Sequence, residues 1–206
     1  MALGDLNEGS DGQNRCWWCG DDPLYVSYHD DEWGHPVADD IRLFEKICLE
    51  GFQAGLSWIT ILRKRENFRA AFAGFDFEKV ARFTDQNVER LVQDAGIIRH
   101  RGKIEAAINN AQRACDLIDE VGSLGKYFWS YEPSKHVSPK SRADIQAVSD
   151  ESKALSKDLK KRGFKFVGPT TMYAHMQAMG LVNDHLVECA HHKIVEGKRS
   201  AFKRPV

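Results

Sequence analysis

Four residues of the kind that bind metal ions are divided between the two ends of this chain. Cys16 and His29 lie near the N-terminus, and His185 and Cys189 lie near the C-terminus. Thiolates and imidazoles are ligands that zinc prefers, and four of them complete a closed tetrahedral site. A four-residue step on a helix would point His185 and Cys189 to the same side. The pattern predicts one structural zinc ion that joins the N-terminal and C-terminal segments.

Neighbouring cysteines and histidines leave the choice of ligands open. Cys19 forms a Cys-x-x-Cys pair with Cys16, and His191 and His192 follow closely behind the C-terminal pair. A shell that contains Cys19, or that uses His191 or His192 in place of His185, would satisfy the same tetrahedral geometry. The odd number of cysteines, five, and the lack of a secretion signal favour thiols and metal ligands over a disulfide framework.

The composition limits the possible partners only weakly. The 206 residues, 42% of them hydrophobic, suffice for one domain with a substantial core or for two small lobes that share one. With 29 Lys and Arg against 30 Asp and Glu, any contact with nucleic acid must come from a local basic patch. No apolar stretch approaches the roughly 18 residues of a membrane span. We expect a cytoplasmic monomer without a membrane partner.

Helical periodicity dominates the chain between its two ends. Apolar residues at three- and four-residue steps predict helices that begin after Asp39 and that cover residues 53–62, 85–94 and 101–120, and no alternating strand pattern competes with them. The fold class is therefore predicted to be all-α. Residues 1–14 are predicted to be a disordered leader, residues 15–192 a single globular unit, residues 132–149 a mobile loop, and residues 193–206 a basic tail.

Basic residues surround a predicted turn between two helices. One helix ends at Gly163, and Pro169 suits the first turn of the next. Gly168 would offer backbone N–H groups to a phosphate, with Lys161 and Lys165 nearby. The pattern predicts a helix-hairpin-helix that holds a DNA backbone without reading bases. An ordinary solvated helix end explains the spacing about as well, because basic residues favour helix C-termini.

The main candidate for chemistry is a carboxylate accompanied by aromatic rings. Glu50 follows an apolar run and precedes a glycine-containing loop, where a carboxylate is costly to bury unless it is used. A water-exposed helix end is the ordinary alternative for a single glutamate. Ring faces and one acid together suit a flat, positively charged ligand. The rings that could form such a box are those of Trp18, Tyr25, Tyr28, Trp33 and Trp58.

Longer motifs carry a resemblance to a known family. They cover residues 22–25, 28–34, 48–51, 53–58, 63–67, 94–100, 163–170 and 180–185. From residue 15 to about residue 189, the chain is similar to the bacterial 3-methyladenine DNA glycosylase I family. The resemblance implies an all-α, helix-hairpin-helix DNA glycosylase fold, and it implies that residues 15–192 form the glycosylase domain. It also implies a structural zinc ion bound by Cys16, His29, His185 and Cys189.

The activity that the resemblance implies is the excision of 3-methyladenine from double-stranded DNA. Glu50 and Tyr28 would be catalytic and would form the base pocket with the other rings. Asn183 stands where many helix-hairpin-helix glycosylases carry a catalytic aspartate, and an amide cannot act as a carboxylate base. Attack on the sugar must therefore be helped in another way.

The expected mechanism starts from a lesion that is already cationic, so that its glycosidic bond is weak. The base would leave the stack, contact the aromatic rings and donate its exocyclic amine to Glu50. Neutral adenine would gain no cation-π attraction, and 7-methylguanine would present an acceptor to the carboxylate. Gly55 and Leu56 could fill the gap in the duplex. The candidates for phosphate contact are Lys161, Lys165 and Gly168, with Arg99 and Arg101 as weaker ones.

Two other classes of function fit parts of the pattern. The first is a non-catalytic, zinc-stabilised helical module that binds alkylated DNA, and release of the free base would separate it from an enzyme. The second is a zinc hydrolase of small molecules, which requires an open metal position. The sequence offers no dinucleotide-binding glycine motif after a strand and no Walker-type loop.

Overall fold

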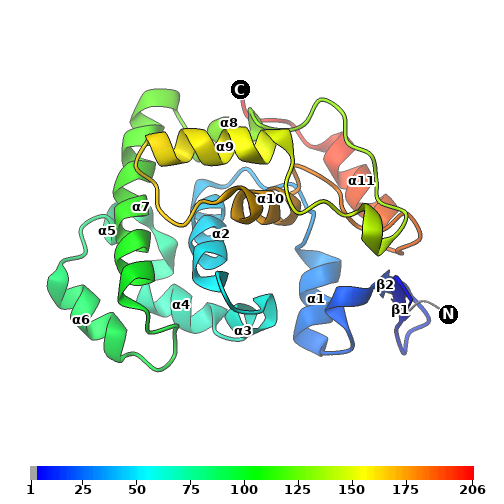
Figure 1. Ribbon diagram of the computed structural model, residues 1–206, viewed down its shortest axis with the longest axis horizontal. Helices are drawn as coiled ribbons and strands as arrows, with labels where there is room; N and C mark the ends of the chain where they lie inside the picture. Colours follow the sequence, from blue (N-terminus) through cyan, green and yellow to red (C-terminus); the bar gives the residue numbers. More distant parts are fainter. Residues whose placement is uncertain (1–3) are drawn as a thin grey trace.

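The computed structural model describes residues 4–206, which form a predominantly helical protein with one small sheet (Figure 1). Within these residues no helix is both long and apolar enough to cross a membrane. The elements in chain order are β1 (Leu6–Glu8), β2 (Asn14–Cys16), η1 (Trp17–Cys19), α1 (Pro23–Asp31), α2 (Asp40–Gln53), α3 (Trp58–Leu62), α4 (Arg65–Ala71), η2 (Ala73–Phe75), α5 (Phe77–Val80), α6 (Asp85–Gln93), α7 (Arg101–Val121), α8 (Leu124–Trp129), η3 (Arg142–Asp144), α9 (Asp150–Lys161), α10 (Pro169–Ala178) and α11 (His192–Ala201).

Most of the helices predicted from periodicity are confirmed. Asp39 caps α2 by accepting a hydrogen bond from the Arg42 amide, and α6 and α7 cover the predicted ranges within one or two residues. The continuous helix predicted over residues 53–62 is wrong. Gly55 adopts a φ of +81°, which is outside the helical region, so the chain breaks between α2 and α3. Periodicity alone does not reveal this break.

Helix α2 is the centre of the core, and α3, α7, α8 and α10 pack against it (Figure 1). Leu43, Phe44, Ile47 and Phe52 are buried along it, but so are charged residues on another side of the same helix. A helix that is covered on every side places its polar residues inside the protein as well. The last two turns of α2 therefore carry side chains into the interior.

The N-terminal segment contains regular structure where a disordered leader is predicted. Residues 1–3 lie outside the described part of the chain, but β1 and β2 pair as antiparallel strands, with Leu6 opposite Cys16. The Arg15 guanidinium donates hydrogen bonds to both Asp11 and Asp30, which ties the hairpin to α1. The prediction is wrong for the paired residues because partners outside the leader hold them, including the distant Ala190 amide, which donates to the Asn14 carbonyl oxygen.

The C-terminal segment also differs from its prediction as an irregular basic tail. Helix α11 covers much of it, with Val195 and Arg199 buried. The Arg199 guanidinium donates to the carbonyl oxygens of Gly180 and Leu181 and to the Glu132 carboxylate. The helix therefore holds together the start of the long loop and the segment that follows α10.

The long loop over residues 132–149 contains only the short turn η3 as regular structure. The Arg142 guanidinium lies 4.9 Å from the ring centroid of Trp17, and the Val187 amide donates to the Pro139 carbonyl. The loop thus contacts both the N-terminal and the C-terminal segments. Its mobility stays a prediction.

Candidate functional site

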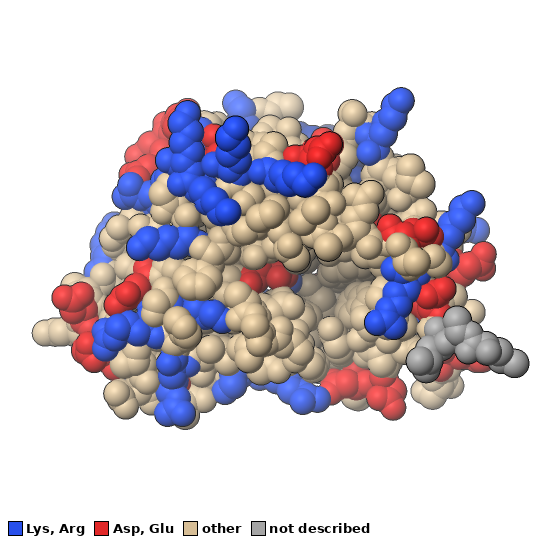
Figure 2. Space-filling view, viewed as in Figure 1, with Lys and Arg blue, Asp and Glu red and all other residues tan. Residues whose placement is uncertain are grey.

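A cavity of about 210 Å³ lies where α1, α2, α3 and α10 meet the long loop. Figure 2 shows the surface hollowed in the middle of this face, with acidic atoms visible inside. All six residues predicted for the base pocket line the cavity: Trp18, Tyr25, Tyr28, Trp33, Glu50 and Trp58. Five further residues line the cavity and were not predicted as part of the base pocket: Trp17, Gln53, Ile145, Ala174 and Gln177.

The aromatic rings of the cavity contact one another at steep angles. The ring centroids of Trp18 and Trp33 are 4.9 Å apart, those of Trp18 and Tyr25 are 5.1 Å apart, and those of Tyr28 and Trp58 are 5.3 Å apart. Tilted and edge-to-face pairs are the favourable arrangement for such rings. The Trp58 indole N–H is buried and has no hydrogen-bond partner within residues 4–206. The lining of the cavity is therefore dominated by aromatic ring surface.

Glu50 lies in the last turn of α2 and is only 6% exposed. The alternative of a water-exposed helix end is therefore wrong. Its Oε1 atom lies 2.7 Å from Nζ of Lys46, one helical turn earlier, which is itself 5% exposed. Because a buried carboxylate is costly without a partner, this ion pair explains how Glu50 can remain inside.

Lys46 is a further residue of the site that the sequence did not predict. Its Nζ atom donates to the Tyr28 hydroxyl at 2.9 Å and lies 3.3 Å from the ring centroid of Trp58. The four-residue spacing from Glu50 was a visible signal, but a lysine is rarely buried. The predicted aromatic box with one acid is present, but it also has a buried lysine beside the acid. The cavity contains an acid whose charge is already compensated.

Burial changes the ionisation of the groups around this ion pair. Burial lowers the pKa of Lys46, and the adjacent Glu50 carboxylate partly opposes that change. Burial raises the pKa of Tyr28 well above its usual value, and the negative charge of Glu50 adds to this effect. Burial likewise raises the pKa of Tyr25 to about 12. Both tyrosines therefore keep their hydroxyl protons at neutral pH.

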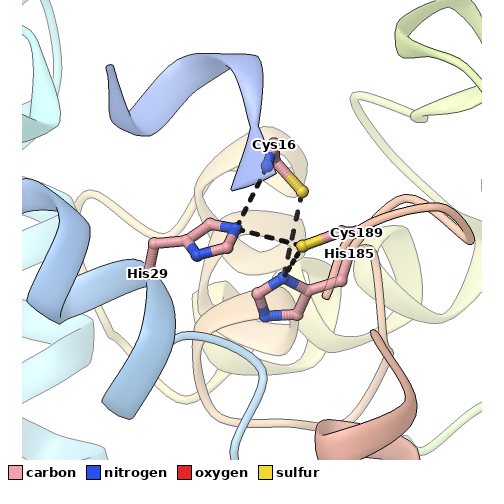
Figure 3. A group of neighbouring side chains, drawn as sticks. All are labelled: Cys16, His29, His185 and Cys189. Carbon is pink, nitrogen blue, oxygen red and sulfur yellow. Dashed lines mark hydrogen bonds between the residues drawn. The ribbon is translucent and has the colours of Figure 1, made fainter. Parts of the chain in front are cut away.

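The four predicted metal ligands meet in one buried cluster, as Figure 3 shows. Their ligand atoms all lie within 4.8 Å of one another. Sγ of Cys189 is 3.6 Å from both His29 Nε2 and His185 Nδ1, and Sγ of Cys16 is 3.8 Å from His185 Nδ1. Metal-ligand bonds of about 2.0–2.3 Å in a tetrahedron imply such separations. The residues present fit a zinc ion.

In both His29 and His185, the ring nitrogen that faces away from the cluster also has a hydrogen-bond partner. His29 Nδ1 lies 2.7 Å from the Asp30 carboxylate, and His185 Nε2 lies 3.0 Å from the Trp33 carbonyl oxygen. Partners of this kind fix the ring orientation of histidines that bind metals. Because Trp33 also lines the aromatic cavity, the cluster and the cavity share a wall.

The alternative ligands are not part of the cluster. The Cys19 thiol donates to the Cys16 carbonyl oxygen, and His192 Nδ1 lies 2.9 Å from the His185 carbonyl oxygen. His191 Nε2 lies 3.2 Å from the Asp30 carboxylate. These side chains support the residues of the cluster rather than replacing them.

The local structure around His185 and Cys189 is a turn and not the predicted helix. Gly180, with a φ of +80°, ends the helical stretch, and a Cβ atom there would lie 2.6 Å from the backbone of Pro36. The amide of Ala190 donates to the Asn14 carbonyl oxygen rather than within a helix. Contacts with the N-terminal segment thus shape the turn that brings the two ligands together.

The hairpin between α9 and α10 presents exposed basic residues. Gly168 is the N-cap of α10, Pro169 is its first residue, and Lys161 and Lys165 are exposed beside them. Figure 2 shows Lys and Arg atoms gathered over α9 and this hairpin. Arg162 instead pairs with Asp158 and Glu120, and Arg101 pairs with Glu89.

Asn110 of α7 holds the backbone of this hairpin in place. Its side chain accepts a hydrogen bond from the Lys165 amide and donates one to the Lys165 carbonyl oxygen. The Ser156 hydroxyl donates to the Val167 carbonyl oxygen. A hairpin fixed in this way keeps the amide groups near Gly168 in a constant orientation.

The other predicted DNA contacts lie at the surface. Gly55 and Leu56 are exposed in the break between α2 and α3, and Arg99 is exposed just before α7. Asn183 is buried, where its amide donates to Glu196 and to the His192 carbonyl oxygen, and it does not line the cavity. Among the residues that line the cavity, Glu50 is the acidic one.

Comparison with known proteins agrees with this arrangement. The family model for methyladenine glycosylases matches residues 18–192. The chain belongs to the methyladenine glycosylase family. It is 54% identical over 177 residues to DNA-3-methyladenine glycosylase 1 of Escherichia coli K12, which covers 85% of this chain and 95% of that protein.

Solved structures of the family have the same fold. A crystal structure of 3-methyladenine DNA glycosylase I superimposes with a TM-score of 0.83 at 51% identity, over 85% of this chain and 98% of that one. A variant of 3-methyladenine DNA glycosylase I in complex with 3-methyladenine also gives a TM-score of 0.83, at 40% identity, over 86% of this chain and 97% of that one.

Proposed function

We propose that this protein is a DNA glycosylase that excises 3-methyladenine from alkylated DNA. The observation that carries the proposal is the buried Glu50 carboxylate inside an aromatic cavity, in a chain about half identical to DNA-3-methyladenine glycosylase 1. A relative of the same fold is known in complex with 3-methyladenine. The cavity suits a flat purine whose amine faces a carboxylate.

In the proposed reaction the damaged nucleotide leaves the duplex and enters the cavity between the rings of Trp18, Tyr28 and Trp58. Glu50 accepts a hydrogen bond from the exocyclic amine. The glycosidic bond breaks, its electron pair neutralises the cationic base, and water adds to the sugar carbon with loss of a proton. No carboxylate base is assigned. The cationic base is a good leaving group, so the catalysis comes from holding the lesion in a reactive position.

The helix-hairpin-helix and the zinc site belong to the same proposal. Helices α9 and α10 with their hairpin would hold the DNA backbone, through the amide groups near Gly168 and through Lys161 and Lys165. Cys16, His29, His185 and Cys189 would hold one zinc ion, whose role is structural because four protein ligands leave no open position. Double-stranded DNA as substrate, the monomeric state and the cytoplasmic location stay predictions.

Release of the free base tests the enzymatic proposal directly. The purified protein should liberate 3-methyladenine from methylated duplex DNA, detected by chromatography of the soluble fraction. Unmethylated DNA should release no base and serves as the control. If the protein binds methylated DNA tightly and releases nothing, it is the non-catalytic binding module instead.

The double substitution of Lys161 and Lys165 by alanine tests the hairpin as the DNA-binding surface. If each lysine neutralises one phosphate, the slope of log affinity against log salt should become smaller by about 2. Titration of labelled duplex at several salt concentrations measures this slope. The exposed Lys126 of α8 provides the control, and its replacement by alanine should leave the slope unchanged. Equal slopes for the double variant and the parent would leave the hairpin without a role in DNA binding.

A further inference from the structure

We propose that Lys46 is a positioning residue that determines the hydrogen-bond polarity of the base cavity. It holds Glu50 as an acceptor and the Tyr28 hydroxyl as a donor. The inference rests on the proposed function, because it concerns how the same cavity tells one purine from another. It goes beyond that function in assigning the discrimination to a lysine outside the cavity lining.

The argument begins with the hydrogen-bonding capacity of an ammonium group, which has three donors and no acceptor. Nζ of Lys46 lies 2.9 Å from the Tyr28 hydroxyl oxygen, so that oxygen must accept. The hydroxyl hydrogen therefore points away from Lys46. No acceptor for this hydrogen is present within residues 4–206, and Tyr28 lines the cavity. The hydroxyl can thus act as a donor to a bound base.

The same ammonium group forms an ion pair with Glu50. Nζ is 2.7 Å from Oε1, and an adjacent positive charge favours the ionised carboxylate. An ionised carboxylate can only accept hydrogen bonds. Within residues 4–206, Lys46 is the one side chain that forms an ion pair with this carboxylate. Glu50 therefore keeps acceptor capacity for a ligand in the cavity.

The surroundings restrict Lys46 to this position. The ammonium group lies 3.3 Å from the ring centroid of Trp58 and 5.2 Å from that of Tyr28, within the range of cation-π attraction. The side chain is 6% exposed, so bulk water has little access to its donors. Burial keeps Tyr28 protonated by raising its pKa, which agrees with a role as donor.

A donor beside an acceptor matches one edge of adenine. That edge carries the N6 amine, which donates, next to the ring nitrogen N7, which accepts. A 6-oxopurine presents a carbonyl acceptor in place of the amine, opposite the Glu50 carboxylate. If Lys46 is removed, the Tyr28 hydroxyl can rotate and the Glu50 carboxylate loses the partner that holds it in place. The cavity can then present either polarity, so the discrimination between the two purines should weaken.

Binding of two free bases to the intact protein tests this role. Calorimetric titration compares 3-methyladenine with 3-methylhypoxanthine, which has a carbonyl in place of the amine. The parent protein should prefer 3-methyladenine by about 100-fold or more, since mispaired buried polar groups cost that much. Lys46→Met should reduce the ratio of the two affinities at least about 10-fold. Lys46→Arg, which keeps a group that only donates, should restore part of the ratio.

A ratio of affinities does not depend on the fraction of protein that is folded, so it separates positioning from stability. Lys103→Met is the matched control, because Lys103 is also buried but donates to the carbonyl oxygens of Phe52 and Ala54. This control should lower the melting temperature and leave the ratio unchanged. An unchanged ratio in Lys46→Met, or an equal fall in Lys103→Met, overturns the role of Lys46.

The outcomes also separate this inference from the proposed function. A parent protein that shows the preference between free bases but releases nothing from methylated DNA would contradict the glycosylase and not the role of Lys46. An active parent enzyme whose Lys46→Met variant keeps the full preference would contradict the role of Lys46 alone.

Discussion

Replacement of Glu50 by glutamine is expected to lower the single-turnover rate of 3-methyladenine release by about 100-fold or more. Glutamine has nearly the same shape, so the α2 backbone and the aromatic rings should remain in place. The amide removes the negative charge, leaves the buried Lys46 ammonium without its counter-ion, and can present a donor to the exocyclic amine of the base. The measurement is the rate of base release from methylated duplex DNA with enzyme in excess.

Glu45 provides a matched control on the same helix. It is also buried and ion-paired, with its carboxylate 2.8 Å from Arg69, but it does not line the aromatic cavity. Glu45→Gln should therefore lower stability while the rate of release per folded molecule stays close to that of the parent. A folded Glu50→Gln protein with the parental rate would remove Glu50 from the mechanism.

Removal of the proposed zinc ion is expected to produce the largest loss of stability. Structural zinc ions bind small domains with an apparent free energy of about 10–16 kcal/mol. If the free energy of unfolding of this protein fell by only about 5 kcal/mol, the melting temperature would fall by roughly 10–20 °C. The cluster joins β2 and α1 to the turn before α11, and in the apo protein these segments lose their shared anchor. Thermal melting before and after treatment with a strong chelator measures the effect.

Two cysteine substitutions show which residues hold the ion. Cys189→Ser should abolish stoichiometric zinc, measured by elemental analysis, and should reproduce the low melting temperature of the chelated protein. Cys19→Ser should retain one zinc ion, because the Cys19 thiol donates to a backbone carbonyl oxygen instead. Loss of zinc from Cys19→Ser, with retention in Cys189→Ser, would reverse the assignment.

The metal cluster also bears on the chemistry of the cavity. Between Cys16 and His29 of the cluster the chain carries Trp18, Tyr25 and Tyr28, and all three line the cavity. Holding both ends of this segment restricts the backbone that positions the rings. We therefore expect treatment with a chelator to weaken the binding of 3-methyladenine while the helices remain folded. Calorimetry measures the binding, and circular dichroism measures the helix content.

Local patterns in the sequence predicted much of the helical framework. The three- and four-residue spacing of apolar residues located α6 and α7, and Asp39 marked the start of α2. Periodicity works for these elements because each buries one face of a regular helix. The sequence, together with its resemblance to a family, also predicted which four residues form the Cys/His cluster and which rings line the aromatic cavity.

Contacts between distant segments decided the rest. The hairpin of β1 and β2, the turn that carries His185 and Cys189, and helix α11 are held by hydrogen bonds to residues far along the chain. A window of neighbouring residues contains no information on such partners. The break at Gly55 likewise depends on a backbone conformation that a hydrophobic pattern does not record.

Lys46 shows what local sequence spacing can predict and what requires the tertiary structure. The sequence by itself determined that Lys46 and Glu50 lie one turn apart on a helix and can form a pair. Only the tertiary structure decided that this pair is buried against Tyr28 and Trp58 rather than solvated. The physical reason is that helical spacing follows from local backbone geometry, whereas burial depends on which other helices cover that face. The difference places the ion pair at the wall of the aromatic cavity instead of at the surface.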